Sequence, residues 1–312
     1  MDPPENPLVS VIMNCFNCEK YLREALDSVF AQTYPHWEII FWDNASDDGS
    51  AAIARSYDER LRYFRGDHTI PVGAARNEAL KQARGEFIAF LDCDDLWLPI
   101  KLEKQIPLFA DPEVGLVFSD SIYFTDAGAS WVLYQNRGYC TGSCFSELLA
   151  DYFLDLETVV LRARVLAEEA DWFDPTFNLI EETEFFTRIA RRWKLAMVPE
   201  PLAKWRIHGA NLTWQKDSLF AQEKTAMLRK YEAAIPGFRS RYAREIKAFE
   251  QEIALCQAKD RWKSGDGRGA RQALKAYGMR NKRAWLFFGL TFLPPSLGLR
   301  LVAKVKKGVM PF

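Results

Sequence analysis

The sequence predicts an α/β fold in which a mostly parallel sheet is flanked by helices and followed by a C-terminal helical region. In the first third of the chain, apolar runs of strand length alternate with helical stretches of about ten to fifteen residues. Polar and acidic side chains follow these runs, at the strand ends where α/β proteins bind ligands. From about Asp217 onward the patterning is helical.

The composition predicts a packed protein, because 312 residues are enough for one large domain with an appended region. Hydrophobic residues make up 48% of the chain and aromatic residues 14%, so we expect order over most of its length. The net charge of −1 does not indicate a nucleic-acid partner. Residues 259–312, however, hold thirteen Lys and Arg against two Asp, which predicts contact with an anionic surface or, as the alternative, a solvated basic helix face.

The first elements follow from apolar patterning and from residues that begin or end helices. A continuous apolar run predicts a strand at 8–15, and one apolar face predicts a helix at 19–32. After a second strand at 37–44, Asp47 or Asp48 can cap a helix that ends at Tyr57. The remaining elements of this half are a strand at 61–66, a helix at 72–85 with Gly85 as its C-terminal cap, and a strand at 87–92.

The second half of the chain has mixed patterning. The elements expected there are strands at 114–124 and 131–134, shorter strands near 156–161 and 195–198, and an amphipathic helix at 182–193. The C-terminal region is expected to contain helices at 221–231, 239–263 and 270–277, with a glycine-containing break at 264–269.

The segment 284–299 is free of charge over sixteen residues. A membrane-spanning helix needs about twenty residues and Pro294-Pro295 interrupts this one, so we expect it to lie in a membrane interface or to pack on protein. We assign 280–307 as a basic, apolar segment for membrane-surface binding or dimerisation. The polar start MDPPENP does not resemble a signal peptide, so we expect a cytoplasmic protein, peripheral on the inner face of the cell membrane.

The six cysteines lie at positions 15, 18, 93, 140, 144 and 256. A zinc site made from Cys15 with Cys18 and Cys140 with Cys144 is disfavoured, because Cys15 ends an apolar strand and no knuckle turn surrounds either pair. Reduced thiols are the simpler expectation for a cytoplasmic protein.

Three carboxylates, those of Asp92, Asp94 and Asp95, follow the strand at 87–92 within four residues. Asp92 and Asp94 can reach toward one site, and their hard oxygen atoms suit Mg²⁺ or Mn²⁺. Such a cation would relieve the repulsion between the carboxylates and would neutralise a diphosphate. A helix-capping role for Asp94 or Asp95 is the alternative, because short acidic triplets are common.

The other strand ends of this half are also polar. Asn14 and Asn17 follow the first strand, Asp43 follows the second, and Arg76 lies on the helix before the acids. All of these positions should converge on one edge of the sheet. An Asp there can accept a hydrogen bond from a base or a ribose, and an Arg can bind a base or phosphates.

Taken together, two stretches resemble a family 2 glycosyltransferase: VSVIMNCFNCEKYLREALDSVFAQTYPHWEIIFWDNASDDGS and GAARNEALKQARGEFIAFLDCDD. The resemblance covers roughly residues 7–215 and implies the GT-A fold, a Rossmann-like, mostly parallel sheet flanked by helices. It also implies an inverting enzyme of the type that builds bacterial cell-envelope polysaccharide. The domain at 1–215 would then hold a nucleotide-sugar half at about 7–97 and an acceptor half at about 98–215, before a helical region at 216–312.

The resemblance implies roles in donor binding for individual residues. Asn17 matches the asparagine that follows the family's first strand, and Asp43 matches the aspartate that holds the nucleotide base. Residues 47–50 match its D-D-G-S turn, and Arg76 matches its A-R-N helix start. Asn14 is a departure, because the family usually has a proline at that strand end.

The metal site implied by the resemblance is the family's DxD motif, here Asp92 and Asp94. Asp94 corresponds to the direct metal ligand, and Asp92 lies nearer the ribose. His208, in the stretch WRIHGANLT, stands where an additional metal ligand is expected. The implied cofactor is a divalent cation, Mn²⁺ or Mg²⁺.

The general base implied by the resemblance opens the helix in FDPTFNLIEETEFFTRIAR. Glu182 takes the place of the usual aspartate, with Glu181 before it. Because the longer side chain departs from the family pattern, Glu181, Glu182 and Glu184 all stay open as the base. The alternative is that these are capping acids, which the helix dipole favours.

The function that follows is inverting transfer of a sugar from a nucleotide-diphosphate sugar, with a UDP-sugar favoured, to a glycan or lipid-linked glycan. A catalytically degenerate nucleotide-sugar-binding module is the alternative. A nucleotidyltransferase or a dinucleotide-binding dehydrogenase is disfavoured, because no glycine occurs in NCFNCEKY after the first strand.

Overall fold

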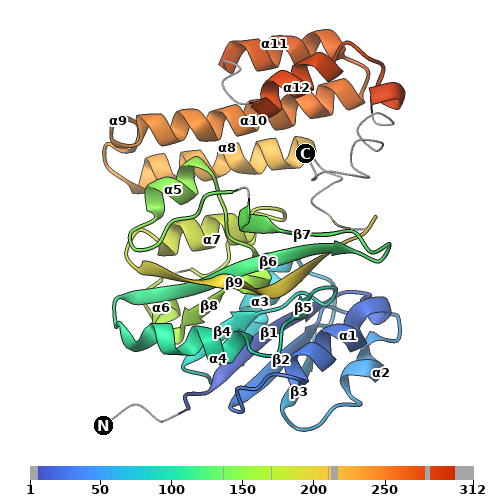
Figure 1. Ribbon diagram of the computed structural model, residues 1–312, viewed down its shortest axis with the longest axis vertical. Helices are drawn as coiled ribbons and strands as arrows, with labels where there is room; N and C mark the ends of the chain where they lie inside the picture. Colours follow the sequence, from blue (N-terminus) through green and yellow to red (C-terminus); the bar gives the residue numbers. More distant parts are fainter. Residues whose placement is uncertain are drawn as a thin grey trace. The chain divides into compact units, whose positions relative to one another are not determined.

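The computed structural model of the chain describes residues 6–135, 137–169, 171–209, 211, 217–277 and 282–298 (Figure 1). The chain forms two compact units, the first made of Met1–Leu148 with Tyr152–Gly209 and the second of Leu149–Asp151 with Ala210–Phe312. The predicted boundary between residues 215 and 216 lies outside the described residues, as do the ends of the predicted segment 280–307.

The strands of the described residues form one sheet in the first unit. They are β1 (Val9–Cys15), β2 (Trp37–Asp43), β3 (Leu61–Arg65), β4 (Phe87–Phe90), β5 (Leu96–Trp97), β6 (Val114–Thr125), β7 (Ser130–Val132), β8 (Val160–Arg162) and β9 (Lys194–Ile207). Their order is β3-β2-β1-β4-β8-β6-β9-β5, with β7 paired to β6. One sheet therefore contains both the strands of the first third of the chain, β1 to β4, and the strands of the mixed second half (Figure 1).

The helices that accompany this sheet are shorter than the two longest helices of the second unit. Up to residue 189 they are α1 (Glu19–Phe30), α2 (Ser50–Ala54), α3 (Val72–Leu80), α4 (Lys101–Gln105), α5 (Phe145–Ala150), α6 (Ala163–Ala167) and α7 (Glu181–Ile189), with 3₁₀ turns η1 (Ile106–Ala110), η2 (Leu133–Gln135) and η3 (Leu156–Thr158). The helices of the second unit are α8 (Asp217–Ala234), α9 (Phe238–Arg241), α10 (Ala243–Lys263), α11 (Gly267–Tyr277) and α12 (Lys282–Leu290).

The first four strands pair in parallel, as the alternation of apolar runs and helices predicts. β1 lies between β2 and β4, with Cys15 opposite Asp43 and Ile12 opposite Phe90. β1 is almost entirely buried, which explains why its sequence is apolar nearly throughout. The carboxyl ends of β1, β2 and β4 consequently lie at the same edge of the sheet.

Several helix ends differ from the sequence prediction. The helix α1 ends at Phe30, α7 ends at Ile189, α8 and α11 begin earlier than predicted, and the stretch 239–263 is divided into α9 and α10.

Two further differences lie close to the sheet. The second helix ends at Ala54 rather than Tyr57, and α3 ends at Leu80 rather than at Gly85. Gly85 does not cap a helix: a Cβ on it would lie 2.6 Å from the Ser10 nitrogen and 2.7 Å from the Phe87 oxygen. Glycine is needed there because the chain enters β4 against the backbone of β1.

The second half of the sheet is mixed, as predicted, but its strands differ in length from the predicted ones. The stretch near 156–161 begins with the 3₁₀ turn η3, and only Val160–Arg162 forms a strand, β8. The stretch predicted as a short strand at 195–198 is part of the fourteen-residue β9, which runs parallel to β6. The run at 131–134 leaves the sheet after Val132 and becomes the 3₁₀ turn η2. Side-chain pattern alone misses the length of β9 because this strand has no regular alternation of buried and exposed positions and contains two prolines.

The second unit is built on long helices, with α8 and α10 packed along each other (Figure 1). A small apolar core joins α10, α11 and α12 through Trp262, Leu274 and Phe287. No helix within the described ranges has both the length and the apolar character required to cross a membrane.

Candidate active site

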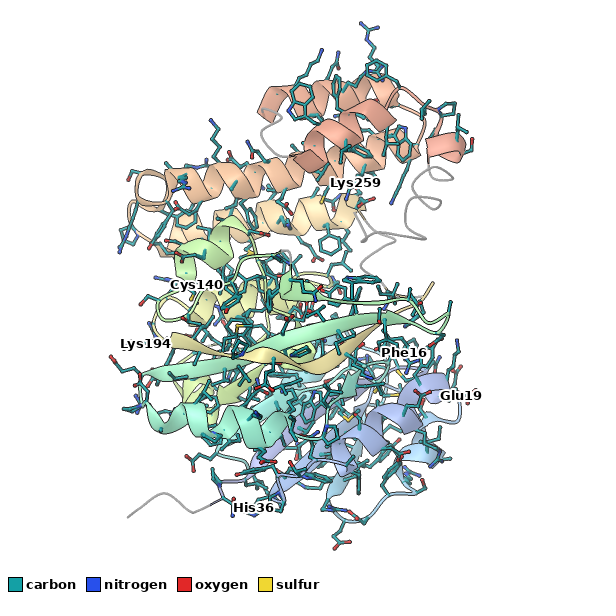
Figure 2. The ribbon with its side chains drawn as sticks, viewed as in Figure 1. Phe16, Glu19, His36, Cys140, Lys194 and Lys259 are labelled. Atoms are coloured by element: carbon teal, nitrogen blue, oxygen red, sulfur yellow. The ribbon has the colours of Figure 1, made fainter. Side chains whose placement is uncertain are left out.

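The loop after β1 and the turn after β2 meet at the carboxyl edge of the sheet. Asn17 adopts a positive φ of 56°, which asparagine tolerates better than most residues, and its Oδ1 accepts a hydrogen bond from the Asp47 nitrogen at 3.0 Å. Asp48 Oδ2 accepts one from the Glu19 nitrogen at 3.0 Å, and Glu19 Oε2 accepts one from the Gly49 nitrogen at 2.6 Å. The D-D-G-S turn is thus fastened to the start of α1, close to the labelled Glu19 in Figure 2.

Asp43 ends β2 and is fully buried. Its Oδ1 accepts a hydrogen bond from the Ser46 nitrogen at 2.8 Å, and its Oδ2 accepts from Tyr63 Oη and from Arg65 Nη1. Burial opposes ionisation, but these hydrogen bonds and the Arg65 charge lower the pKa of the carboxyl. Both oxygens are therefore engaged within the protein, and the predicted contact of Asp43 with a base stays a prediction.

Asn14 precedes the last residue of β1, at the edge where these strands end. Its side-chain Oδ1 and Nδ2 are both buried and have no hydrogen-bond partner among the residues that the structure describes. Leaving a buried amide unpaired costs about 1–3 kcal/mol, so such a group usually serves a ligand or a water. The departure from the family's proline therefore places an unpaired amide donor and acceptor at the predicted donor edge.

Arg76 joins the two acidic stretches of the site. It lies on α3, is only 4% exposed, and donates Nη2 to Asp92 Oδ1 at 3.0 Å and Nη1 to Glu181 Oε1 at 2.5 Å. The Arg76 side chain is therefore enclosed between the two acids and is not a solvated residue of the helix surface. A buried guanidinium held by two carboxylates fixes the strand end after β4 to the start of α7.

The acids after β4 are held by residues at the end of β9. His208 Nε2 lies 2.8 Å from Asp94 Oδ2, and the Arg206 backbone nitrogen donates to Asp95 Oδ1 at 2.8 Å. Arg206 Nε also donates to the Asp94 carbonyl oxygen at 2.9 Å. Burial and the nearby charge of Asp92 raise the pKa of the Asp94 carboxyl, against the opposing effect of His208.

The three glutamates that open α7 have different surroundings. Glu184 is fully buried and receives Nε and Nη2 of Arg188 at 2.9 and 3.1 Å. Glu181 is paired with Arg76, while its buried Oε2 has no partner. Glu182 is partly exposed, and within the described part of the chain its carboxylate makes no ion pair or hydrogen bond.

The local electrostatics raise the pKa values of both Glu181 and Glu182, and the shift is the larger one for Glu182. Burial raises the pKa of its carboxyl well above the usual range, while the charge of Arg76 opposes the rise and the charge of Glu181 adds to it. A raised pKa makes a carboxylate a stronger base, provided that the pH is high enough to ionise it.

The donor atoms around Asp94 are of the kind that a hard divalent cation takes. Asp92 and Asp94 supply carboxylate oxygens with side chains 41% and 32% exposed, and His208 supplies an imidazole nitrogen next to Asp94. The raised pKa of Asp94 shows a carboxylate whose charge is incompletely compensated by the protein. Asp94 and His208 are adjacent and suit the predicted cation, but the donor atoms of Asp92, Asp94 and His208 do not all lie within 4.8 Å of one another, and Asp92 is paired with Arg76.

Sequence reasoning missed three side chains that organise this edge: Tyr63, Arg65 and Arg206. Tyr63 and Arg65 lie on β3, whose sequence LRYFRG carries no functional signal, and only the strand order brings them to Asp43. Arg206 stands two residues before His208 in WRIHGANLT, and the R-x-H spacing was a signal that could have identified it. Each of them positions an acid that the sequence did single out.

Comparison with known families gives one match over half of the chain. The model of a family described as glycosyl transferase family 2 matches residues 10–166. The uncharacterized glycosyltransferase MJ1057 of Methanocaldococcus jannaschii is 31% identical over 215 residues, which are 65% of this chain and 72% of that protein. The predicted family is thereby confirmed.

Two further relatives match over a shorter stretch. TuaG of Bacillus subtilis, described as a putative teichuronic acid biosynthesis glycosyltransferase, is 39% identical over 36% of this chain and 46% of its own length. WfgD of Escherichia coli, described as UDP-Glc:alpha-D-GlcNAc-diphosphoundecaprenol beta-1,3-glucosyltransferase, is 36% identical over 36% of this chain and 45% of its own. The chain thus spans less than half the length of these two curated relatives.

Solved structures share the fold at low sequence identity. The mannosyltransferase PcManGT from Pyrobaculum calidifontis, solved with GDP-Man and Mn²⁺, has a TM-score of 0.63 and 20% identity, over 98% of this chain and 88% of its own. Staphylococcus aureus TarS (residues 1–349) has a TM-score of 0.58 and 18% identity, over 93% of this chain and 82% of its own. These likenesses confirm the predicted fold class.

Proposed function

The chain belongs to glycosyl transferase family 2, and on this premise we propose that it transfers a sugar from a nucleotide-diphosphate sugar to an acceptor hydroxyl with inversion at the anomeric carbon. The observation that carries the proposal is the unequal surroundings of the α7 glutamates. Two of them are committed to arginines, and Glu182 is left with an unpaired, partly exposed carboxylate of raised pKa.

In the proposed mechanism Glu182 is the general base. Its carboxylate accepts the proton of the acceptor hydroxyl while that oxygen attacks the anomeric carbon from the face opposite the diphosphate. The bond to the leaving diphosphate breaks in the same displacement, so no second nucleophile on the chain is required. Glu181 and Arg76 orient the start of α7 and so position Glu182.

Donor binding is assigned to the carboxyl edge of β1, β2 and β4. We place the nucleotide along Asn14, Asn17 and Asp43, where the unpaired Asn14 amide offers one donor and one acceptor. Asp94 and His208, with Asp92, would hold a divalent cation, which supplies charge neutralisation of the leaving diphosphate when it is bound. The Mn²⁺ and GDP-Man of PcManGT and the UDP-Glc in the name of WfgD support a nucleotide-sugar donor, and we favour a UDP-sugar.

The acceptor is proposed to be a glycan or lipid-linked glycan of the cell surface. The names of TuaG and WfgD, which refer to teichuronic acid and to a diphosphoundecaprenol acceptor, support this class. In the second unit, Trp285, Leu286 and Phe292 are 57%, 55% and 64% exposed, and the Arg271 guanidinium lies 4.3 Å from the centre of the Phe292 ring. Exposed aromatic and aliphatic side chains with nearby cations are typical of a peripheral membrane surface.

The donor proposal is tested by titrating the purified protein with UDP-, GDP- and dTDP-sugars, with Mn²⁺ and then with EDTA. Thermal stability and nucleotide release are followed together. We expect one donor class to stabilise the protein in the presence of metal and to be hydrolysed slowly, with both effects lost in Asp94→Ala. Metal-dependent binding without any nucleotide release would instead indicate the degenerate binding module.

The membrane proposal is tested by flotation with anionic vesicles. We expect the wild type to co-float and the variant with Trp285, Leu286 and Phe292 changed to Ser to stay in solution. Ile100→Ser, which removes an exposed apolar residue of the first unit (37% exposed), is the matched control and should float. A triple variant that still floats but changes from dimer to monomer in light scattering would overturn membrane binding in favour of dimerisation.

A further inference from the structure

Three cysteines come together beside the acids of the site. Cys15 ends β1, Cys18 directly precedes α1, and Cys93 follows β4 between Asp92 and Asp94. All three are free thiols, and their sulfur atoms lie within 4.8 Å of one another. In the parts of the chain that the structure describes, no other set of three or more His, Cys, Asp or Glu has donor atoms that close.

The grouping differs from the one that the sequence offered. The pairs Cys15 with Cys18 and Cys140 with Cys144 do not form one site, and Cys93 joins the first pair instead. Figure 2 shows Cys140 far across the first unit from Phe16, the residue that follows Cys15. Cys93 was not recognised because its approach to Cys15 depends on β1 and β4 being neighbours in the sheet.

The sulfur atoms are held in place by the surrounding chain. Cys93 Sγ donates to the Asn14 carbonyl oxygen at 3.2 Å, Cys18 Sγ donates to the Phe16 carbonyl oxygen at 3.5 Å, and Cys15 Sγ lies 3.7 Å from Ser46 Oγ. Cys15 and Cys93 are buried, while Cys18 is partly exposed. The cluster thus has two enclosed ligands and one open side toward solvent.

We propose that Cys15, Cys18 and Cys93 form a binding site for one thiophilic divalent cation, Zn²⁺ or Cd²⁺, separate from the carboxylate site. Zinc–sulfur bonds of about 2.3 Å place tetrahedral sulfur ligands about 3.8 Å apart, so the present spacing needs an adjustment of no more than about 1 Å. The fourth position is taken by water on the open side at Cys18. Binding releases the thiol protons to solvent, and three thiolates with one divalent ion leave a single negative charge.

The carboxylate site and the neighbouring cysteine cluster should bind different ions, because their ligand atoms differ. Carboxylate oxygens favour Mg²⁺ and Mn²⁺, whereas thiolates favour Zn²⁺ and softer ions. Cys93 lies between the two aspartates, and its side chain turns back to the Asn14 carbonyl oxygen while Asp92 and Asp94 face Arg76 and His208. Hydrogen bonds among the three sulfur atoms lower the pKa of the Cys15 thiol and raise the pKa values of the Cys18 and Cys93 thiols, so one thiolate is stabilised in the cluster and a bound ion must displace the other two protons.

The test is a titration of the reduced full-length chain with Cd²⁺ alone, following sulfur-to-cadmium charge-transfer absorption in the ultraviolet. We expect saturation at one Cd²⁺ per chain and displacement of the absorption by Zn²⁺. Cys18→Ser, at the most exposed of the three positions, should weaken binding at least about tenfold, since a change in the outer ligand shell alone can cost that much. Cys140→Ser is the matched control and should bind like wild type.

Two further variants test whether the absorption comes from the cysteine cluster and not from the carboxylate site. Asp94→Asn should leave the charge-transfer absorption unchanged, because carboxylates do not produce it. Cys93→Ala, checked for folding by circular dichroism, should lose binding as Cys18→Ser does. The proposal is overturned if the wild type shows no stoichiometric absorption while its thiols are reduced, or if Cys140→Ser weakens binding as much as Cys18→Ser.

Discussion

The acids after β4 and the acids that open α7 look alike in sequence, yet the fold divides each set in the same way. In each set one carboxylate is buried against a structural partner: Asp95 against the Arg206 nitrogen, and Glu184 against Arg188. One member of each set is paired with Arg76. The carboxylates of the remaining two, Asp94 and Glu182, are held by none of these arginines, and we assign the chemistry to them.

This comparison teaches that the number of acids at a site says little about how many of them react. Glu184 and Asp95 stabilise the loops and helix that present their neighbours, and Arg76 makes the two sets one unit. A substitution should therefore change either activity or stability according to the partner of the acid, and four measurements examine that division.

The largest effect is expected for Glu182→Gln. Removing the proposed base should lower kcat by about 10²- to 10⁴-fold, the usual contribution of general base catalysis, with little change in the melting temperature. Steady-state kinetics with the donor found by titration provides the measurement. The assignment of Glu182 as the base would be contradicted if Glu182→Gln remained active while Glu184→Gln, correctly folded, lost its activity.

The next effect concerns stability. Glu184→Gln removes the charge of a fully buried partner of Arg188. Because Arg188 keeps its ion pair with Glu169, we expect the loss of the charged hydrogen bonds to cost about 1.5–3 kcal/mol in free energy of unfolding. Glu168→Gln is the matched control, because its pair with Arg164 has the same spacing but is exposed, and it should cost less than about 0.5 kcal/mol. Urea unfolding of both variants checks this, and equal costs would contradict a structural role for Glu184.

Asp94 and Asp95, which are neighbours after β4, should contribute differently to metal binding. Asp94→Asn should weaken Mn²⁺ binding at least about tenfold, because even changes in the outer ligand shell cost that much. Asp95→Asn should leave Mn²⁺ affinity nearly unchanged, since an amide oxygen can still accept the hydrogen bond from the Arg206 nitrogen. Calorimetric Mn²⁺ titration measures both, and a larger loss in Asp95→Asn would reverse the assignment.

The smallest effect is a pH dependence. Because burial raises the pKa of Glu182, its carboxylate loses its ionised, proton-accepting form as the pH falls through a value above the usual range of about 4.3. We therefore expect kcat/KM to rise with pH and then level off, by about tenfold per unit on the acidic limb. The limb should disappear in the residual activity of Glu182→Gln, and a limb that persists there would assign the titration to another group.

Much of the fold followed from local pattern. The strands at 8–15 and 37–44 were predictable because a strand buried on both faces has a continuous apolar sequence. The end of α3 was not, because Lys81–Gly85 has helical residue types and only the approach to β1 stops it. Likewise β9 extends far beyond its apolar core, since pairing with β6 supplies hydrogen bonds that the local sequence does not reveal.

By itself the sequence determined the class of fold, the family, and which strand ends carry acids, since these depend on periodicity and on the order of residues along the chain. The tertiary structure decided which acids form ion pairs with arginines. It also brought Tyr63 and Arg65 into hydrogen-bonding distance of Asp43, and Cys93 next to Cys15 and Cys18. Partners far apart in the sequence make these contacts, and strand order brings them within hydrogen-bonding or ligand distance. The free energy of a buried charge or thiol depends on those partners, so its role was fixed only when the chain folded.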